Sequence, residues 1–403
     1  MSEYAEAKRT MLDHDVVVVG AGPSGLHTAR RLAERGLDVL VLEKKNRVGE
    51  AVNCTGLIGT EVFDEFGLSS DSVLRRIQDV KLVSPGGTAV DYHHPSCFAH
   101  VVDRDRFDQG LGEQACAAGG RIRTGVGVRD VLRSKDRVEV QATTGDEEPF
   151  VVTARAVVIA TGIQQDLSRK LDLGRPAKHL YGVQVEAETD AEEPLTIFAG
   201  TAFAPGGFAW AVPSQSGRAK FGLITDRDVR RGFEAFRQKY IQNRPVRFEE
   251  RSVAYKPIAQ GLTSRTFGPR VLAVGEAAGQ VKTTTGGGVA FGLRCAEIAA
   301  DVLAAQVHKG STMETGLAEY ERLWKREFRA EILLGYYARR IWARLNDAHI
   351  ERVFQFVRSD GVIPIIREKG NFDRHGELIL ALLRRFNLFG ILDGITLRLS
   401  RLN

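Results

Sequence analysis

A run of β-branched residues near the N-terminus, Asp15 to Gly20 (DVVVVG), leads directly into the glycine pattern Gly20-Ala-Gly22-Pro-Ser-Gly25. An uninterrupted apolar run of this length is typical of a parallel strand that is buried on both faces of a sheet. Helical spacing of apolar residues follows over Pro23 to Gly36, and Asp38 to Glu43 (DVLVLE) supplies a second strand. This strand, helix, strand order predicts an α/β fold with a right-handed crossover.

The three glycines of this pattern have different predicted tasks. Gly20 permits a tight turn, Gly22 lets a pyrophosphate approach the backbone, and Gly25 lets the helix pack closely on the strand. The N-terminus of the helix offers free N–H groups to the phosphates. Glu43, at the end of the second strand, is placed to accept a hydrogen bond from a ribose 2′-hydroxyl and to repel a 2′-phosphate. The pattern predicts a bound dinucleotide.

A second motif indicates which dinucleotide. Val271 to Gly279 (VLAVGEAAG) reads as a strand that ends in Gly275-Glu276, and Thr283 to Gly288 (TTTGGG) precedes a helix. The carboxylate is expected to lie against ribityl hydroxyls. The positive end of the helix after the glycines would stabilise negative charge on a reduced flavin ring. We therefore predict FAD as the cofactor.

Further elements are predicted along the rest of the chain. An antiparallel hairpin is expected around the Pro-Gly-Gly turn of residues 79–94, and strands dominate between Lys178 and Pro257. The other expected elements are helices at 106–119, 229–242 and 288–307, a β-meander at 137–152, and strands at 156–160 and 270–275.

Composition restricts the class of protein. The four cysteines form no C-x-x-C pair, so neither a zinc site nor a disulfide framework is indicated, no metal is expected, and a reducing cytoplasmic location is predicted. No apolar stretch reaches the roughly 18 residues of a membrane-spanning helix. The formal charge of +5 is concentrated after Glu321, which suits an anionic lipid surface or a solvated basic face. Nucleic-acid recognition signatures are missing, so no nucleic-acid partner is expected.

Several motifs together resemble the para-hydroxybenzoate-hydroxylase-like flavoproteins: DVVVVGAGPSGL, LVLEKK, VDRDRFD and VLAVGEAAG. Within that superfamily, Asn53-Cys54-Thr-Gly56, Tyr181 to Val185 (YGVQV) and Pro205 to Pro213 (PGGFAWAVP) resemble the geranylgeranyl reductase family. The resemblance implies reduction of carbon–carbon double bonds in isoprenoid chains by reduced FAD. An isoprenoid or prenyl lipid is the implied substrate.

The implied fold is an α/β FAD-binding Rossmann-like domain of the glutathione-reductase type, interleaved with a β-sheet substrate domain and followed by a helical C-terminus. We expect the FAD-binding domain at 1–78, 98–177 and 265–310, the substrate domain at 79–97 and 178–264, and a helical basic region at 311–403. The residues expected to contact FAD are Gly20, Gly22, Pro23, Ser24, Gly25, Glu43, Lys44, Arg104, Val128, Thr161, Gly162, Gly275, Glu276, Gly286, Gly287 and Gly288.

Two departures from the superfamily pattern bear on the electron donor. Glu276 stands where Asp is usual and keeps the carboxylate. Thr161-Gly162 stands where related hydroxylases have an Asp-Gly associated with binding pyridine nucleotide as well as FAD. The chain has one G-x-G-x-x-G and hence no separate nicotinamide domain. The expected donor is a reduced ferredoxin-like protein or NADPH.

The candidate catalytic residues are Cys54, Phe208 and Trp210. Saturating an alkene needs a hydride and a proton, and a thiol kept neutral by apolar surroundings suits the proton donor. The alternative for Cys54 is a small packing residue. Phe208 and Trp210 share one face of a strand and are expected to line a prenyl channel, or else to form the core of the second sheet. For Arg104, an ion pair with neighbouring aspartates is the alternative to FAD contact.

Two questions stay open at this level. The main functional alternative is a flavin-dependent monooxygenase or halogenase of the same superfamily. The segment from Leu378 to Asn403, rich in Leu, Ile and Phe with four arginines, is expected either to contact a membrane surface peripherally or to pack onto the enzyme or a dimer partner.

Overall fold

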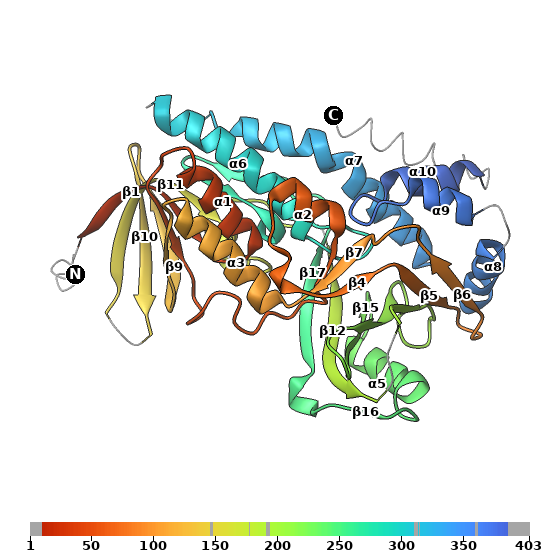
Figure 1. Cartoon of the computed structure of the whole chain (residues 1–403). Coiled ribbons are helices and arrows are strands. Elements are labelled where there is room, and N and C mark those ends of the chain that lie inside the picture. The colour runs from red at the N-terminus through yellow and green to blue at the C-terminus, as the bar shows by residue number, and fades with distance from the viewer. Residues whose placement is uncertain are drawn as a thin grey trace.

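The computed structural model describes residues 10–145, 148–176, 178–190, 194–309, 313, 315–358 and 362–385. An α/β layer carries the N-terminal strand and long helices (Figure 1), and a second sheet with its own helix lies beside that layer. The C-terminal helices gather at the opposite end from the N-terminus. The predicted α/β class with a helical C-terminus is confirmed.

The first sheet is built on parallel strands in the order β19, β11, β1, β2, β8. β1 (Thr10–Val19) lies between β2 (Val39–Leu42) and β11 (Phe150–Ile159) and pairs in parallel with both. β19 (Val271–Ala273) extends the parallel ladder beyond β11. Because the strands are parallel, the loops after β1, β2, β11 and β19 all emerge at one edge of the sheet.

The structure corrects the prediction of a meander separate from the strand at 156–160. β11 is one continuous strand. Its first half pairs antiparallel with β10 (Val138–Thr144), while its second half pairs in parallel with β19. β9 (Val126–Arg133) completes the meander on the outer side of β10. β11 thus belongs both to the meander and to the parallel part of the sheet, because β10 and β19 pair with successive parts of the same edge of β11.

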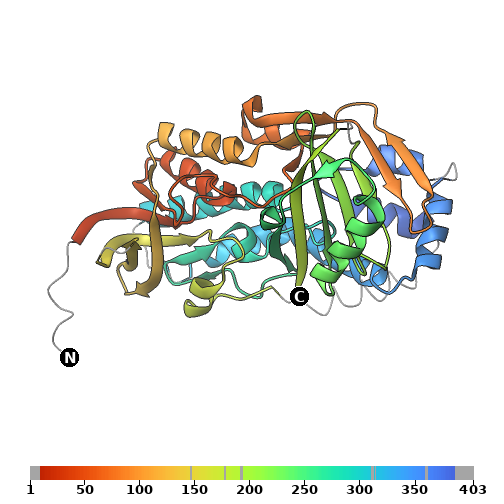
Figure 2. The same cartoon turned by 90° about the horizontal axis from the view of Figure 1, so that it is seen from below.

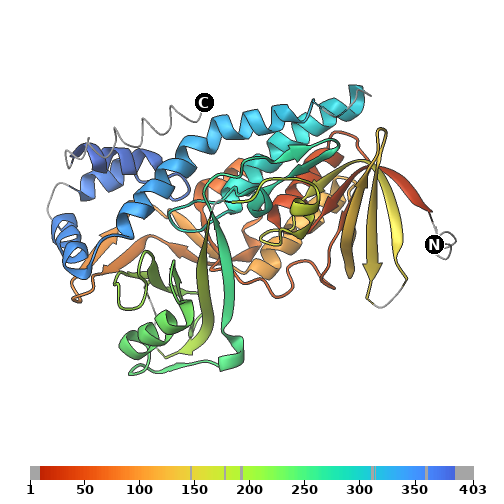
Figure 3. The same cartoon turned by 180° about the vertical axis from the view of Figure 1, so that it is seen from behind.

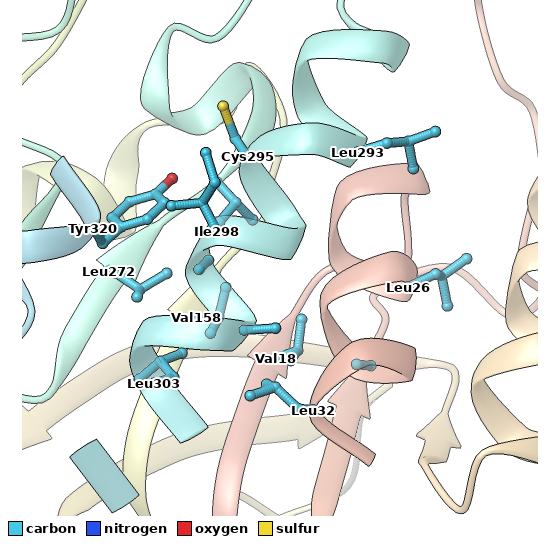
Figure 4. Close-up of a cluster of buried hydrophobic side chains, with 14 of the residues drawn as sticks. Val18, Leu26, Leu32, Val158, Leu272, Leu293, Cys295, Ile298, Leu303 and Tyr320 are labelled. Atoms are coloured by element: carbon cyan, nitrogen blue, oxygen red, sulfur yellow. The ribbon is translucent and has the colours of Figure 1, made fainter. Parts of the chain in front are cut away.

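Helices cover one face of the first sheet. α1 (Pro23–Ala33) and α6 (Val289–Lys309) pack against the sheet, and α7 (Ala318–Trp342) lies along α6. Figure 4 shows Val18 and Val158 of the sheet near Leu32 of α1 and Leu303 of α6, and Leu26 on the other side of α1 belongs to the same buried cluster. All of these side chains are fully buried. Burying apolar surface in this way is the main stabilising contribution to the layer.

The expected helix bounds shift where caps decide them. α3 (Arg104–Ala117) begins two residues earlier than predicted, because the Asp103 carboxylate accepts hydrogen bonds from the N–H groups of Asp105 and Arg106 at 3.0 and 3.4 Å. α1 ends before Gly36, which has a left-handed φ of 78°.

The second sheet has β12 (Lys178–Thr189) between β15 (Arg218–Thr225) and β17 (Ala254–Gln260), and β14 (Phe208–Pro213) beyond β15. Figures 2 and 3 show α5 (Val229–Tyr240) against this sheet, on the side away from the long helices. The remaining strands of this sheet are β5 (Asp79–Val83), β6 (Ala89–His93), β13 (Thr196–Phe198) and β16 (Val246–Arg247).

A small third sheet, which the sequence did not predict, links the two larger parts. It has the order β3 (Leu57–Gly59), β7 (Ala99–Val102), β4 (Val73–Ile77). The other short elements are α2 (Thr60–Phe66), α4 (Asp166–Lys170), β8 (Arg121–Arg123), β18 (Phe267–Gly268) and three 3₁₀ turns, η1 (Ser70–Ser72), η2 (Glu250–Ser252) and η3 (Gly275–Ala278).

The C-terminal region folds back onto the molecule through α8 (Asp347–Val357), α9 (Ile363–Lys369) and α10 (Gly376–Arg385). Residues 370–375, which we call the strap, connect α9 and α10. Buried Lys282 donates to Asp373 Oδ1 at 2.7 Å and to the Phe372 carbonyl at 2.9 Å. Asp373 Oδ2 also accepts from the Gly59 N–H at 3.1 Å. The strap is thereby fixed to β3 and to the loop before α6.

The predicted apolar C-terminal segment is described only in part. Within α10, Leu378, Leu380, Leu382 and Leu383 are half-buried, and Arg384 and Arg385 end the helix exposed. Residues 386–403 lie outside the described part of the chain. Across the described helices, none has the length and apolar character needed to cross a membrane.

His375 in the strap makes the fold sensitive to acid. Its Nδ1 lies 2.6 Å from Thr284 Oγ1 and its Nε2 lies 3.0 Å from the Phe372 carbonyl, so the neutral ring satisfies both partners when Nε2 carries the proton. Burial, followed by the charge of Lys282, lowers the pKa of His375 to about 4. The unfolded chain takes up this proton near pH 6.5, so protonation favours unfolding as pH falls from 6.5 toward 4.

We expect His375→Gln, which cannot be protonated, to reduce the acid sensitivity of folding. The histidine contributes up to about 3 kcal/mol of pH-dependent stability across that window. Denaturant unfolding of both proteins at pH 7 and pH 4.5 measures the difference. An equal loss of stability in the two proteins would contradict this assignment.

Candidate active site

The glycine pattern forms a tight loop between β1 and α1. Gly20 has φ of 108°, and a Cβ there would lie 2.5 Å from the Ala160 carbonyl oxygen. A Cβ on Gly25 would lie 2.1 Å from the Gly20 carbonyl oxygen. Packing within the protein therefore explains both glycines.

Gly22 is different, because no part of the protein that the structure describes requires a glycine there. It caps α1 with φ of −83° and ψ of 175°, which any residue can adopt, and a Cβ would meet no atom of the described residues within 4 Å. Pro23 and Ser24 follow at the start of the helix. The space beside Gly22 lies at an α1 N-terminus whose N–H groups suit phosphate. This cradle fits the pyrophosphate of the predicted FAD.

Glu43 is held against the same loop. Its Oε2 accepts a hydrogen bond from the Ala21 N–H at 2.7 Å, and its Oε1 accepts from the Lys45 N–H at 2.9 Å. Lys44, between them, is exposed. Val128 is half-buried on β9, whose first residue donates from its N–H to the Glu43 carbonyl at 2.8 Å. The fixed carboxylate is suited to accept hydrogen bonds from a ribose.

The loops after β11 and β19 come together at the same edge. A Cβ on Gly162, which has φ of 63°, would lie 3.8 Å from Glu276 Oε2. Gly275 packs so closely on Ser24 that a Cβ would lie 2.4 Å from the Ser24 hydroxyl oxygen. Thr161 donates from its hydroxyl to the Gln164 carbonyl at 2.7 Å. These predicted cofactor residues are thus brought together although they come from three distant segments.

Glu276 also connects this edge to the second sheet. Its Oε2 lies 2.8 Å from Nζ of Lys256, on β17. Gly286, Gly287 and Gly288 lie just before α6, and a Cβ on Gly286 would lie 3.2 Å from Ile258 of the same strand. The N-terminus of α6 therefore begins at the junction between the first and second sheets, where its dipole would stabilise negative charge on a bound group.

Cys54 lies in the loop before β3, partly buried, and its surroundings differ from the prediction. We expected an apolar pocket. Burial does tend to raise the pKa of the thiol, but the charge of Arg104, a hydrogen bond from the backbone of Gly56 and the charges of Lys256 and Lys220 lower it overall. Three cations from distant elements, Arg104, Lys256 and Lys220, thus act on the thiol.

Arg104 is buried in an ion pair as well as facing the thiol. Its guanidinium donates to both carboxylate oxygens of Asp108, at 2.9 to 3.0 Å. Burial opposes the charge of Arg104, but the charges of Asp108 and Cys54 and hydrogen bonds to both groups raise its pKa. The ion pair that we considered as an alternative is thus present, and Arg104 also belongs to the Cys54 surroundings.

Phe208 and Trp210 lie on the face of the second sheet that looks toward the Cys54 loop. Their ring centroids are 5.9 Å apart, and the Trp210 ring lies across Gly222, where a Cβ would come within 2.5 Å of it. Trp210 is 8 % exposed, and its Nε1 has no hydrogen-bond partner within the described residues. Both rings pack in an apolar cluster that we call the aromatic cluster, with Leu180, Ile224, Ile258, Phe98 and Phe372 among its members.

Sequence reasoning missed two contributors. Lys220 lies on β15 between Ala219 and Phe221, and the alternation along the strand turns its side chain toward the same face as Trp210. A lysine inside an apolar run was the available signal. Phe372 comes from the strap, and no local pattern indicates that it packs beside Phe98 with centroids 5.9 Å apart.

A matched pair of glycine substitutions tests the cradle. Gly22→Ala should fold normally but lose most of its FAD, because the new Cβ would occupy the space for the pyrophosphate. Gly25→Ala should instead destabilise the protein itself, since its Cβ would overlap the Gly20 carbonyl. Flavin absorbance after purification and thermal unfolding measure the two effects. If folded Gly22→Ala keeps its full flavin content, the pyrophosphate does not bind beside Gly22.

Comparison with known proteins agrees with this geometry. The model of the FAD binding domain family matches residues 13–331. Digeranylgeranylglycerophospholipid reductase 1 of Methanopyrus kandleri is 30% identical over 377 residues, covering 89% of this chain and 98% of the relative. Digeranylgeranylglycerophospholipid reductase 2 of Methanothermobacter thermautotrophicus is 29% identical over 353 residues, covering 85% of this chain and 91% of the relative.

Solved structures share the fold. A geranylgeranyl bacteriochlorophyll reductase-like protein of Thermoplasma acidophilum superposes with a TM-score of 0.81 at 21% identity, covering 92% of this chain and 96% of that one. A p-nitrophenol 4-monooxygenase of Pseudomonas putida superposes with a TM-score of 0.71 at 19% identity, covering 89% of this chain and 97% of that one. The predicted FAD cofactor and oxidoreductase class are confirmed by the family match. The chain belongs to the FAD binding domain family, within the group of FAD-dependent reductases that includes the digeranylgeranylglycerophospholipid reductases.

Proposed function

We propose that this enzyme saturates carbon–carbon double bonds in the isoprenoid chains of a polar lipid. The observation that carries the proposal is that two lysines connect Cys54 to both predicted regions. Lys220, on the same sheet face as Trp210, donates to the Cys54 carbonyl, and Lys256, which acts on the Cys54 thiol, pairs with Glu276 of the predicted cofactor motif. A prenyl chain needs an apolar surface, and its reduction needs a proton donor at that surface. The names of the relatives, digeranylgeranylglycerophospholipid reductases, supply the substrate class.

In the proposed reaction the double bond gains one hydride and one proton. Reduced FAD, when bound, supplies a hydride to one alkene carbon and is oxidised by two electrons. Cys54 donates its proton to the other carbon, so the chain gains two hydrogens. Arg104, Lys220 and Lys256 stabilise the thiolate that remains, and solvent returns its proton. A thiol whose pKa is lowered toward neutral pH is a better matched acid than an ordinary buried thiol.

The proposal includes the two partners left open by the sequence. Electrons reach FAD from a reduced ferredoxin-like protein or from NADPH. We also propose a peripheral contact with anionic lipid through the exposed Arg384 and Arg385 at the end of α10. A basic residue near an anionic surface contributes about 1 kcal/mol to binding.

One experiment tests substrate, donor and membrane contact together. The substrate, a digeranylgeranylglycerophospholipid, is presented in neutral or anionic vesicles to the anaerobic enzyme. Dithionite, reduced ferredoxin or NADPH supplies electrons in separate samples. We expect mass gains in steps of two hydrogens with dithionite and with at least one biological donor. Pelleting of the enzyme with anionic vesicles but not with neutral vesicles would support the membrane contact.

The main alternative gives a different result in the same assay. A monooxygenase or halogenase would leave the lipid unchanged under anaerobic conditions and would consume O₂ in step with substrate oxidation. No gain of hydrogen in any sample, with flavin that is fully reduced by dithionite, would reject the proposal.

Cys54→Ser should slow the reoxidation of reduced FAD by the lipid roughly 100-fold, which is the lower range for losing a general acid. FAD content should stay the same, because the thiol makes no part of the phosphate cradle. Cys116→Ser, at an exposed cysteine on α3, is the matched control and should reoxidise at the normal rate. Stopped-flow absorbance of the flavin measures both. Equal rates of flavin reoxidation in the two variants would show that Cys54 is a packing residue and not the proton donor.

A further inference from the structure

Lys220 is a buried cation, and among the described residues its ammonium donates hydrogen bonds to the Cys54 loop. Its side chain extends from β15, and the residue is 8 % exposed. The ammonium donates to the Cys54 carbonyl at 3.4 Å and to the Thr55 carbonyl at 3.1 Å. Both acceptors are some 165 residues away along the chain, so the second sheet reaches across to hold this loop.

Other contacts fix the same loop on two further sides. Thr55 donates from its hydroxyl to Oε1 of Gln184, on β12, at 2.9 Å. The Gly56 carbonyl accepts from the Val102 N–H at 2.9 Å, and Gly56 has a left-handed φ of 80°. The loop is therefore held between β7 and the second sheet. Lys220 supplies the contact to the Cys54 carbonyl.

Burying an ammonium group is costly. Desolvation of an ion in a protein interior costs several kcal/mol, and two backbone carbonyls compensate only part of it. Burial lowers the pKa of Lys220, while the charges of Cys54 and Glu186 oppose that effect. A methionine would fill the same space without the cost. Packing therefore does not explain why the residue is a lysine, whereas an electrostatic task beside the thiol does.

We propose that Lys220 is a positioning residue, which clamps the Cys54–Thr55 backbone against the second sheet and stabilises the thiolate at Cys54. The part of this inference that concerns proton transfer by Cys54 rests on the proposed function. The cations that act on the thiol are Arg104 from α3, Lys256 from β17 and Lys220 itself. The acidic groups near these cations are Asp108 for Arg104, Glu276 for Lys256, and Glu186 and Asp103 for Lys220.

Three variants separate the clamp from the charge. Lys220→Met removes both, Lys220→Gln keeps a hydrogen-bond donor without charge, and Lys220→Arg keeps the charge. Lys170→Met is the matched control, because Lys170 is half-exposed on α4 and pairs with Asp130 away from this site. All are purified with FAD bound, and thermal unfolding confirms that each is folded.

The main readout is the pH dependence of Cys54 alkylation by iodoacetamide, followed at the Cys54 peptide by mass spectrometry. An opposite charge near a titrating group shifts its pKa by about one unit or more. We expect the alkylation midpoint to rise by about one pH unit in Lys220→Met and Lys220→Gln, and to stay near the original value in Lys220→Arg and Lys170→Met.

The second readout is lipid reduction, in which kcat should fall about 10-fold in Lys220→Met, because this variant loses both the charge beside the thiol and the hydrogen bonds that hold the loop, with KM unchanged. Lys220→Gln should retain more activity, because the amide still holds the loop.

The outcomes distinguish the two proposals. An unchanged alkylation midpoint in both neutral variants would overturn the role of Lys220, even if lipid reduction proceeds. If Lys220→Met does not fold, Lys220→Gln alone decides the question. A shifted midpoint in an enzyme that reduces no lipid would support the electrostatic link between Lys220 and Cys54 and would reject the proposed function instead.

Discussion

The cofactor end of this protein depends on a contact that only glycines allow. A Cβ on Gly275 would lie 2.4 Å from the Ser24 hydroxyl oxygen, and a Cβ on Gly292 would lie 2.2 Å from it. The start of α1, the end of β19 and the first turn of α6 are therefore packed around one small side chain. Because these segments meet so closely, both helix N-termini lie at the carboxyl edge of the parallel sheet, where Glu43 and Glu276 are also held.

The second constraint is electrostatic. Arg104, Lys220 and Lys256 come from α3, β15 and β17, yet all three contribute to lowering the pKa of the Cys54 thiol. Like charges gathered in a partly buried site repel one another, and each needs its own compensation. Asp108 supplies it for Arg104, Glu276 for Lys256, and two loop carbonyls for Lys220. The site keeps cations near a group that becomes negative when it gives up a proton.

One face of the second sheet combines this polar corner with the aromatic cluster. Along β15, Lys220 faces the Cys54 loop, while Gly222 and Ile224 lie under Trp210 and the rest of the cluster. The strap contributes Phe372 to the cluster, and the Lys282 Nζ lies 4.5 Å from the centroid of the Phe372 ring. The same surface thus combines an apolar cluster with a contact to the Cys54 loop. The proposed reduction of an isoprenoid double bond needs both an apolar surface and a proton donor.

The sequence by itself determined the α/β class, the FAD cofactor and the placement of Phe208 and Trp210 on one face of a strand. Each of these follows from local rules, namely strand and helix periodicity and the backbone approach that glycine permits. Only the tertiary structure decided the surroundings of Cys54, the continuity of β11 and the arrival of Phe372 from the strap. Cys54 and Lys220 are 166 residues apart, and their meeting depends on how two sheets dock. Local patterns predict which face a side chain occupies, but the pKa of a thiol depends on the charges that distant segments bring to it.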